Sequence, residues 1–233
     1  MARWSLYGGR DPRELPAYTL ADAARFIHVP SATLSTWFKG RNYPRKQGGP
    51  GASRRLITPA DSKYGRLSFF NVVEAHVLRA LRTDHRIPLH TVRAALDYAE
   101  TTLGMEHLLL SNDLLTAQGE LFLEHYGSLI SLGHAGQIAM RKVLEMYLRR
   151  VERDERNIPI RLFPFVTERS AESQSIVIDP SVSFGRPIVA GSGITTSILV
   201  RRIDAGETME HLAHDYGIPV EKITDAVLFE KAA

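Results

Sequence analysis

The sequence predicts a mainly α-helical protein with small β elements, an α+β fold, and three observations support this. Apolar residues recur with helical spacing in several separate segments, short β-prone stretches lie between them, and a helix-turn-helix pattern occurs twice. At 233 residues the chain is long enough for more than one core. We expect a winged helix-turn-helix domain (1–104), a strand-helix-strand middle and dimerisation region (105–166), a linker (167–174) and a C-terminal helix-turn-helix-like module (175–233).

The charge of the chain is unevenly distributed. Residues 1–93 hold 16 Lys and Arg against 6 Asp and Glu, a net charge of +10, whereas residues 94–233 hold 13 against 20, a net charge of −7. Between Arg25 and Arg66, nine basic residues accompany a single acid, Asp61. Such an asymmetry indicates a polyanionic partner at the basic end, and nucleic acid is favoured over a merely solvated face.

The first helix-turn-helix begins at Thr19, whose hydroxyl is a predicted N-cap. Four apolar residues with helical spacing follow it, namely Leu20, Ala23, Ala24 and Ile27. The segment 28–30 breaks this helix, and Ser31 is the predicted N-cap of the next. The second helix buries Leu34, Trp37 and Phe38 and ends at Gly40.

Ten residues form the predicted DNA-binding surface. Short hydroxyl side chains on the second helix permit a close approach to a groove, and cations in the following segment are suited to phosphates or the minor groove. We expect a wing with a β-prone piece at residues 54–58, although a disordered basic loop is an equal alternative for residues 46–53. The helix contributes Ser31, Thr33, Ser35, Thr36 and Lys39, and the wing contributes Arg41, Arg45, Lys46, Arg54 and Arg55.

Two further helices are predicted after the wing, over residues 69–84 and from Pro88 to residue 103. With the partial wing motif Lys63-Tyr64-Gly65-Arg66, residues 18–103 resemble the MerR-type winged-helix family. The resemblance implies that this part of the chain binds double-stranded DNA.

The middle region combines β-like segments with one amphipathic helix. Residues 114–116, 120–123 and 128–132 are β-like, residues 137–156 form a helix with a solvated, mixed-charge end, and residues 158–165 alternate as a strand. The helix and the last strand are the candidate homodimer interface, because operators read by a helix-turn-helix are usually palindromic.

The C-terminal module repeats the first helix-turn-helix at one constant offset. Thr19 aligns with Thr208, Ala24 with Ala213, Val29 with Ile218, Pro30 with Pro219, Leu34 with Ile223, and Phe38 with Val227. The outward residues differ, since Glu221, Lys222, Thr224 and Asp225 replace the hydroxyl-rich set. Carboxylates are repelled by phosphates, so we expect this copy to contact protein instead of DNA.

Residues 175–231 also carry a set of short motifs. These are Asp179-Pro180, Gly185-Arg186-Pro187, Gly191-Ser192-Gly193-Ile194, Gly206-Glu207 and Asp215-Tyr216. The set resembles a small prokaryotic domain, once catalogued only as of unknown function, that is associated with VapB-type antitoxins. The sequence departs from the family at Ser192 and Gly193, where Thr and Arg are frequent. The resemblance implies a PIN-domain ribonuclease toxin as partner, autorepression of the shared operon, and partner contacts by Phe184, Arg186, Ile188 and Ile194.

Other classes of function are less well supported by the sequence. The absence of cysteine excludes disulfides, thiolate zinc sites and thiol catalysis. His211 and His214 lack a third ligand at a recognisable spacing, so we expect no metal, no cofactor and no enzyme activity. Without a signal-peptide or membrane-spanning segment, a cytoplasmic protein is expected. The alternatives are a MerR-like, ligand-responsive regulator that has no toxin and whose residues 105–165 bind the ligand, and a nucleic-acid enzyme.

Overall fold

The computed structural model describes residues 7–44, 50–82, 87–105, 107–166 and 173–232. It is 53% helical with small antiparallel sheets, which confirms the predicted α+β class. The helices are α1 (Leu20–Phe26), α2 (Ser31–Lys39), α3 (Phe69–Arg82), α4 (Leu89–Thr101), α5 (Ala117–Leu129), α6 (His134–Leu148), α7 (Thr196–Asp204), α8 (Met209–Tyr216) and α9 (Val220–Lys231). The strands are β1 (Arg41–Pro44), β2 (Pro50–Ser53), β3 (Val151–Arg153), β4 (Pro159–Leu162), β5 (Ile176–Val177) and β6 (Ile188–Val189).

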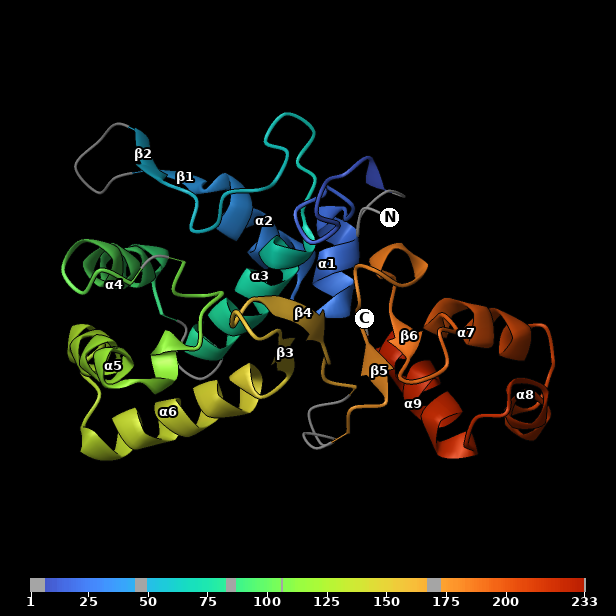
Figure 1. Cartoon of the computed structure of the whole chain (residues 1–233). Coiled ribbons are helices and arrows are strands. Elements are labelled where there is room, and N and C mark those ends of the chain that lie inside the picture. Colours follow the sequence, from blue (N-terminus) through green and yellow to red (C-terminus); the bar gives the residue numbers. More distant parts are fainter. Residues whose placement is uncertain (1–6, 45–49, 83–86, 106, 167–172, 233) are drawn as a thin grey trace.

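Helix α3 is the centre of the fold. It lies between the first two helices and α6 (Figure 1), and most of its side chains are buried, Phe69, Val72 and Leu78 among them. Helices α4 and α5 pack on each other, and α5 also packs on α6. Because α3 contacts both the helix-turn-helix and the middle region, these two parts share one hydrophobic core.

The β-like segments predicted at residues 114–116, 120–123 and 128–132 are wrong. Residues 113–115 form a 3-10 turn, and residues 117–129 form α5. Thr116 begins α5 as its N-cap, with its Oγ1 accepting the amide of Gly119 at 3.4 Å. Phe122 and Tyr126, one helical turn apart, are fully buried, and the Tyr126 hydroxyl donates to the carbonyl of Leu81 at 2.9 Å. Helical burial against α3 and α4 therefore overrides the local β propensity.

The predicted amphipathic helix over residues 137–156 ends early. Helix α6 stops at Leu148, and residues 151–153 form β3. Arg150, predicted to lie in a solvated charged end, is only 3% exposed. Its guanidinium donates to the carbonyls of Phe163, Pro164 and Ser173, at 2.5, 2.9 and 2.5 Å. These backbone acceptors satisfy the buried cation, so the expectation of a solvated end was wrong for Arg150.

The predicted strand over residues 158–165 is present as β4, which pairs with β3 in an antiparallel hairpin. A bridge between Leu162 and Ile178 joins this hairpin to the C-terminal module. Within that module β5 pairs with β6, and α7 packs on α9. Residues 167–172 of the predicted linker lie outside the described residues.

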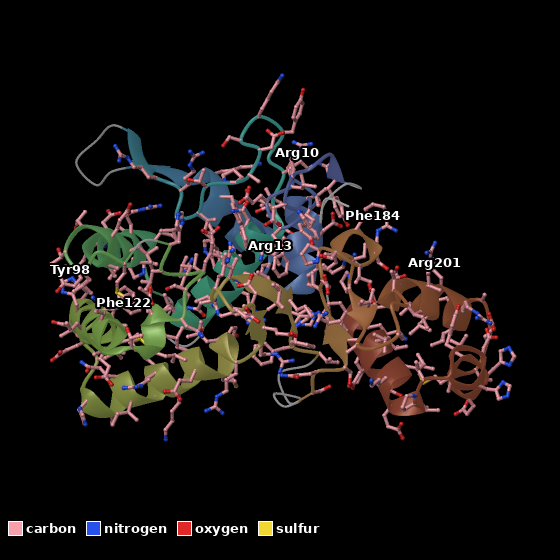
Figure 2. The ribbon with its side chains drawn as sticks, in the orientation of Figure 1. Arg10, Arg13, Tyr98, Phe122, Phe184 and Arg201 are labelled. Atoms are coloured by element: carbon pink, nitrogen blue, oxygen red, sulfur yellow. The ribbon has the colours of Figure 1, made fainter. Side chains whose placement is uncertain are left out.

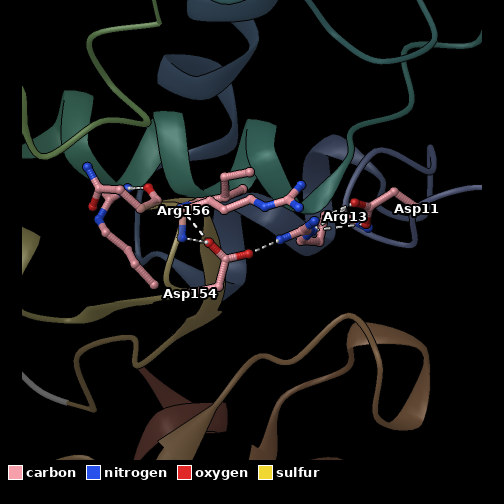
Figure 3. A network of polar contacts seen from close by, with 7 residues as sticks. Asp11, Arg13, Asp154 and Arg156 are labelled. Carbon is pink, nitrogen blue, oxygen red and sulfur yellow. Dashed lines mark hydrogen bonds and ion pairs between the residues drawn. The ribbon is translucent and has the colours of Figure 1, made fainter. Parts of the chain in front are cut away.

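A polar network attaches the segment before α1 to the middle region (Figure 3). Arg13 donates to Asp11 through Nε at 2.9 Å and to Asp154 through Nη1 at 3.2 Å. Asp154 in turn accepts the amides of Arg156 and Ile158, both at 3.0 Å. These hydrogen bonds hold the pKa of the Asp154 carboxyl below its usual range, the Ile158 amide contributing most. The network fixes the N-terminal segment on the β3–β4 hairpin.

Candidate nucleic-acid interface

The first helix of the helix-turn-helix starts with a capping box. The Asp22 amide donates to Thr19 Oγ1 at 3.0 Å, and the Thr19 amide donates to the Asp22 carboxylate at 3.1 Å. Two orphan amides of the first turn are thereby satisfied. The N-cap predicted at Thr19 is confirmed.

The turn between α1 and α2 is compact. His28 adopts a left-handed conformation (φ 50°), and the Val29 amide donates to the carbonyl of Ala24 at 2.9 Å. Val29 is buried, as expected for a residue that fills the turn. The N-cap of α2 is Pro30 and not Ser31, which is the first helical residue. The extended conformation of Pro30 (ψ 132°) ends the turn one residue earlier than predicted.

Helix α2 buries one face and leaves the other open. Leu34, Trp37 and Phe38 form the buried face, as predicted. On the opposite face Ser31 and Lys39 are exposed, and Thr33, Ser35 and Thr36 are half-buried. The Thr36 hydroxyl donates to the Thr33 carbonyl at 2.7 Å. Thr36 is therefore partly committed to its own helix, whereas no hydrogen bond of the Ser35 hydroxyl appears among the described residues.

A β hairpin follows α2 directly. Strands β1 and β2 pair antiparallel, Arg41 opposite Ser53, whereas Arg45 and Lys46 lie outside the described residues. The strand predicted at residues 54–58 is wrong. Those residues run back along α2 instead, where the amides of Leu56 and Ile57 donate to the Trp37 carbonyl at 2.7 and 3.1 Å.

Cations from three segments line one hollow beside α2. Arg54 and Arg55 are exposed, and a hollow of about 410 Å³ is lined by Lys39, Arg55 and Lys63. Lys63 and Tyr64 belong to a second projecting loop, closed by the bridge between Asp61 and Arg66. This loop and the hairpin project from the same edge of the molecule as α2 (Figure 1).

Lys63 and Tyr64 were not among the predicted DNA-binding residues. The Tyr64 side chain is 70% exposed, and Lys63 Nζ lies 5.0 Å from the centre of the Tyr64 ring. The partial wing motif in the sequence was the signal that could have identified them. An exposed cation beside an exposed aromatic ring is suited to a phosphate backbone.

Some of the basic residues counted in the sequence serve the fold instead. Arg79 Nη1 donates to the carbonyl of Ile27 at 2.6 Å, near the end of α1. Arg25 forms an ion pair with Glu230, with Nη1 and Oε2 2.5 Å apart. Arg82 lies over the ring of Trp37. The net charge of residues 1–93 therefore overstates the charge available to a polyanion.

The C-terminal repeat has the same backbone hydrogen bonds as the first copy. The Ile218 amide donates to the Ala213 carbonyl at 3.1 Å, as Val29 does to Ala24, and Gly217 (φ 63°) is left-handed like His28. Thr208 caps α8 through the amide of His211, at 3.2 Å. Together with the buried positions Ile223 and Val227, which match Leu34 and Phe38, these bonds confirm a second helix-turn-helix.

Two outward residues of the second copy form hydrogen bonds within the protein. Lys222 Nζ donates to the Ala190 carbonyl at 2.9 Å, and the Asp225 carboxylate accepts the Ser173 hydroxyl at 2.8 Å. Lys222 and Asp225 occupy the positions that Thr33 and Thr36 hold in α2. The outward face of α9 is therefore closed, in the sense that its Lys222 and Asp225 side chains are hydrogen-bonded within the protein. The outward face of α2 is open, because its side chains make no such bonds to distant residues in the part of the chain that the structure describes.

The residues predicted to contact a partner fall into two environments. Phe184 is 71% exposed and left-handed (φ 55°), and it lies where the C-terminal module approaches the N-terminal segment (Figure 2). Arg186 is also exposed. In contrast, Ile188 is 4% exposed and Ile194 is half-buried. The structure brings Phe184 and Arg186 together at the surface and places Ile188 inside.

No group of three or more His, Asp or Glu residues has the arrangement of a metal site within the described part of the chain. Nor does any described helix have the length and apolar character needed to cross a membrane.

A helix-turn-helix with an open second helix, followed by a hairpin, defines a protein of the helix-turn-helix class. Residues 16–96 match the family model described as "Putative DNA-binding HTH domain", and residues 176–229 match "Protein of unknown function (DUF433)". The chain is 32% identical to the Mycobacterium tuberculosis protein named "Putative antitoxin VapB45", over 92% of this chain and 93% of that protein. The chain belongs to the family of this protein.

Two further relatives come from the same organism. "Uncharacterized protein Rv2308" is 24% identical, over 92% of this chain and 90% of its own length. The crystal structure of Rv2018 superposes with a TM-score of 0.65 at 26% identity, covering 91% of this chain and 97% of that one. The likeness thus extends over the helix-turn-helix, the middle region and the C-terminal module together.

Proposed function

We propose that the protein is a cytoplasmic antitoxin of a type II toxin-antitoxin pair. In this role it binds its own operator DNA as an autorepressor and neutralises a PIN-domain ribonuclease toxin. The similarity to a protein named as an antitoxin, over nearly the whole chain, supports the antitoxin role. An antitoxin acts by binding, so no catalytic group is required.

The open face of α2 is the observation that carries the DNA-binding half of the proposal. Ser31, Thr33 and Ser35 contact base edges, and Lys39, Arg55 and Lys63 contact phosphates around the hollow that they line. Arg41, Arg45, Lys46 and Arg54 are proposed to add further phosphate contacts. The internal hydrogen bonds of Lys222 and Asp225 on α9 support protein contacts, instead of DNA contacts, for the C-terminal module.

The exposed ring of Phe184 supports a toxin contact on the C-terminal module. Large aromatic side chains and arginines are enriched among the residues that dominate protein interfaces, and Phe184 with Arg186 supplies both. A left-handed conformation at a non-glycine residue is strained and persists where the surroundings require it. In the proposed complex, the strained backbone at Phe184 presents the ring to the toxin.

The protein is proposed to act as a homodimer on a palindromic operator. The buried stripe of α6 packs on α3, and Leu162 and Phe165 are buried, so these faces are already occupied. Exposed apolar side chains on the outer faces of α5 and α6, Leu121 and Ile138 among them, are the better candidates for the dimer contact. A monomer in solution scattering at micromolar concentration would contradict this assignment.

Two measurements test the function. The full chain should bind DNA from upstream of its own gene more tightly than random duplex, and it should co-purify with a PIN-type nuclease encoded next to it. DNA binding without a toxin would favour the alternative, a ligand-responsive regulator. Failure of both would refute the proposal.

A further inference from the structure

A cavity of about 580 Å³ lies next to the helix-turn-helix. Its walls come from the N-terminal segment at Glu14, residues 56–60 after the hairpin, the first half of α3, one face of α4, and the residues that follow α4. Phe70, Leu96 and Met105 supply the apolar part of these walls. The volume lies within the range of small-molecule sites in proteins.

One carboxyl group in the cavity wall lacks a counter-charge. Glu74, on α3, accepts the side-chain amide of Asn71 at 2.8 Å, and this is its one hydrogen bond within the described parts of the chain. No cation pairs with it among those residues. Burial raises the pKa of the Glu74 carboxyl to about 7, against the opposing effect of the Asn71 hydrogen bond. A cation beside Glu74 would offset the free-energy cost of burying the ionised carboxylate.

The other charged groups of the cavity make its balance negative. Glu14 faces it from the N-terminal segment, Asp97 and Glu100 face it from α4, and Arg93 and His107 are the basic groups. Burial lowers the pKa of Arg93, and Asp97 opposes this effect whereas Arg54 adds to it. An anion would therefore meet more carboxylates than cations.

We propose that this cavity binds a small organic cation, an ammonium group on an apolar body, with the Glu74 carboxylate as its counter-charge. The apolar part of the walls takes up the body of the ligand, and the ammonium group occupies the otherwise uncompensated position beside Glu74. The walls are five segments of one chain around a volume of small-molecule size, which favours such a ligand over a partner's lysine side chain.

The position of Glu74 also couples the cavity to α2. The side-chain amide of Asn71, which donates to Glu74, donates to the Thr58 carbonyl at 2.9 Å, and Asn71 Oδ1 accepts the Ala60 amide at 2.8 Å. The segment that contains Thr58 and Ala60 is also bonded to the end of α2, because the amides of residues 56 and 57 donate to the Trp37 carbonyl. An ammonium group that draws Glu74 away from Asn71 therefore acts on the segment that positions α2 and the hairpin.

The binding step is tested by calorimetry with hexylammonium as the probe and hexanol and hexanoate as its neutral and anionic counterparts. The full chain should bind hexylammonium at least about tenfold more tightly than either counterpart. Glu74→Gln keeps an acceptor for Asn71 and should reduce that affinity about tenfold, whereas Glu210→Gln, at an exposed position of α8, should not. Equal binding of all three probes, or no effect of Glu74→Gln, overturns the proposal.

Two readouts make the result independent of variant folding. In the unmodified chain, the ε-methyl resonance of Met105, which lines the cavity, should shift saturably with hexylammonium. Because Glu74 must be ionised, the affinity should rise about tenfold between about pH 6 and about pH 8. Histidines also change charge in this range, so His107→Gln should keep the profile, whereas Glu74→Gln should abolish it.

The coupling rests on the proposed DNA-binding function, whereas the binding step does not. Saturating hexylammonium should change operator affinity several-fold, and operator DNA should change hexylammonium affinity by the same factor. Ligand binding with unchanged DNA affinity refutes the coupling alone. Absence of DNA binding in every condition refutes the proposed function and leaves the site intact. If only toxin binding depends on Glu74, the occupant is a partner's side chain and the small-molecule site is wrong.

Discussion

Arg25 and Glu230 form an ion pair, with Nη1 and Oε2 2.5 Å apart, between the first helix-turn-helix and the last helix of the chain. Two neighbours reinforce the contact. The ring of His28, in the turn before α2, lies 5.3 Å from that of Phe229, and Glu230 Oε1 also accepts the hydroxyl of Thr196 at 2.5 Å. The C-terminal module is therefore anchored on the helix-turn-helix, so we expect the two to unfold together.

Glu230→Gln should reduce the free energy of unfolding by about 1 kcal/mol, because it removes an ionic hydrogen bond whose Arg25 partner is partly solvated. Urea denaturation of the full chain measures this change. Glu221→Gln, at an exposed position of the same helix, is the control. Equal effects of the two substitutions would show that the ion pair contributes nothing.

Replacing Arg54 and Arg55 by Ala should weaken binding to operator and random duplex alike. Each lost phosphate contact should reduce the salt dependence, the slope of log affinity against log salt, by roughly one unit. Fluorescence anisotropy over a salt series tests this, with Arg201→Ala, an exposed cation of α7, as the control. If slope and affinity are unchanged, the hairpin exit does not lie at the DNA interface.

Ser35→Ala should alter sequence preference more than non-specific affinity, with a cost at its cognate base pair of roughly 1–3 kcal/mol. The control is Thr224→Ala at the equivalent position of α9, where the hydroxyl donates to the Val220 carbonyl at 3.0 Å. Binding to a library of single-base operator variants should therefore change for the α2 substitution alone. An equal change in both would contradict the division of roles between the two copies.

Phe184→Ala should weaken toxin binding by about 2 kcal/mol or more and leave thermal stability unchanged, because the ring is 71% exposed. Calorimetry of the purified pair measures the affinity. Leu228→Ala removes an exposed apolar side chain elsewhere on the module (44% exposed) and should have no effect. Full retention of toxin affinity by Phe184→Ala would place the contact elsewhere.

The pH dependence of stability should reveal two opposing groups on α3. Burial lowers the pKa of His76 from 6.5 to about 3, so below 6.5 the unfolded chain gains a proton that the folded chain lacks, and acid destabilises the fold. Burial raises the pKa of Glu74 from 4.5 to about 7, so in the range 4.5–7 the folded chain holds the extra proton, and rising pH destabilises it. Between 4.5 and 6.5 the two effects oppose each other.

Glu74→Gln should therefore expose the His76 effect. The free energy of unfolding should then rise with pH between about 4.5 and 6.5 by up to about 1.4 kcal/mol per unit more steeply than in the unmodified chain. Urea titrations at several pH values provide the measurement. A slope identical in both proteins would mean that Glu74 does not hold its proton in the folded state.

Local patterns in the sequence were sufficient for both helix-turn-helix copies. The cap at Thr19 and the helical spacing of the buried face of α2 are features that extend over about ten residues, and periodicity and capping chemistry encode them directly. The second copy repeats the same local pattern, so the constant offset between the copies is visible in the sequence. The same patterns distinguished the outward residues of the two copies. Tertiary structure then supplied the reason that α9 is closed, in the bonds of Lys222 and Asp225 to residues distant in sequence.

The middle region was decided by tertiary structure. Residues 117–129 have local β propensity, yet they form a helix because Phe122 and Tyr126 are buried together against α3 and α4. Arg150 lies in a run of charges that local reasoning places in water, but carbonyls 13–23 residues away satisfy it inside the protein. The cavity at Glu74 likewise requires five separate segments to meet. The sequence determines where helices and caps can form. Burial depends on which distant surfaces meet in the folded chain, and short-range periodicity does not encode those long-range contacts.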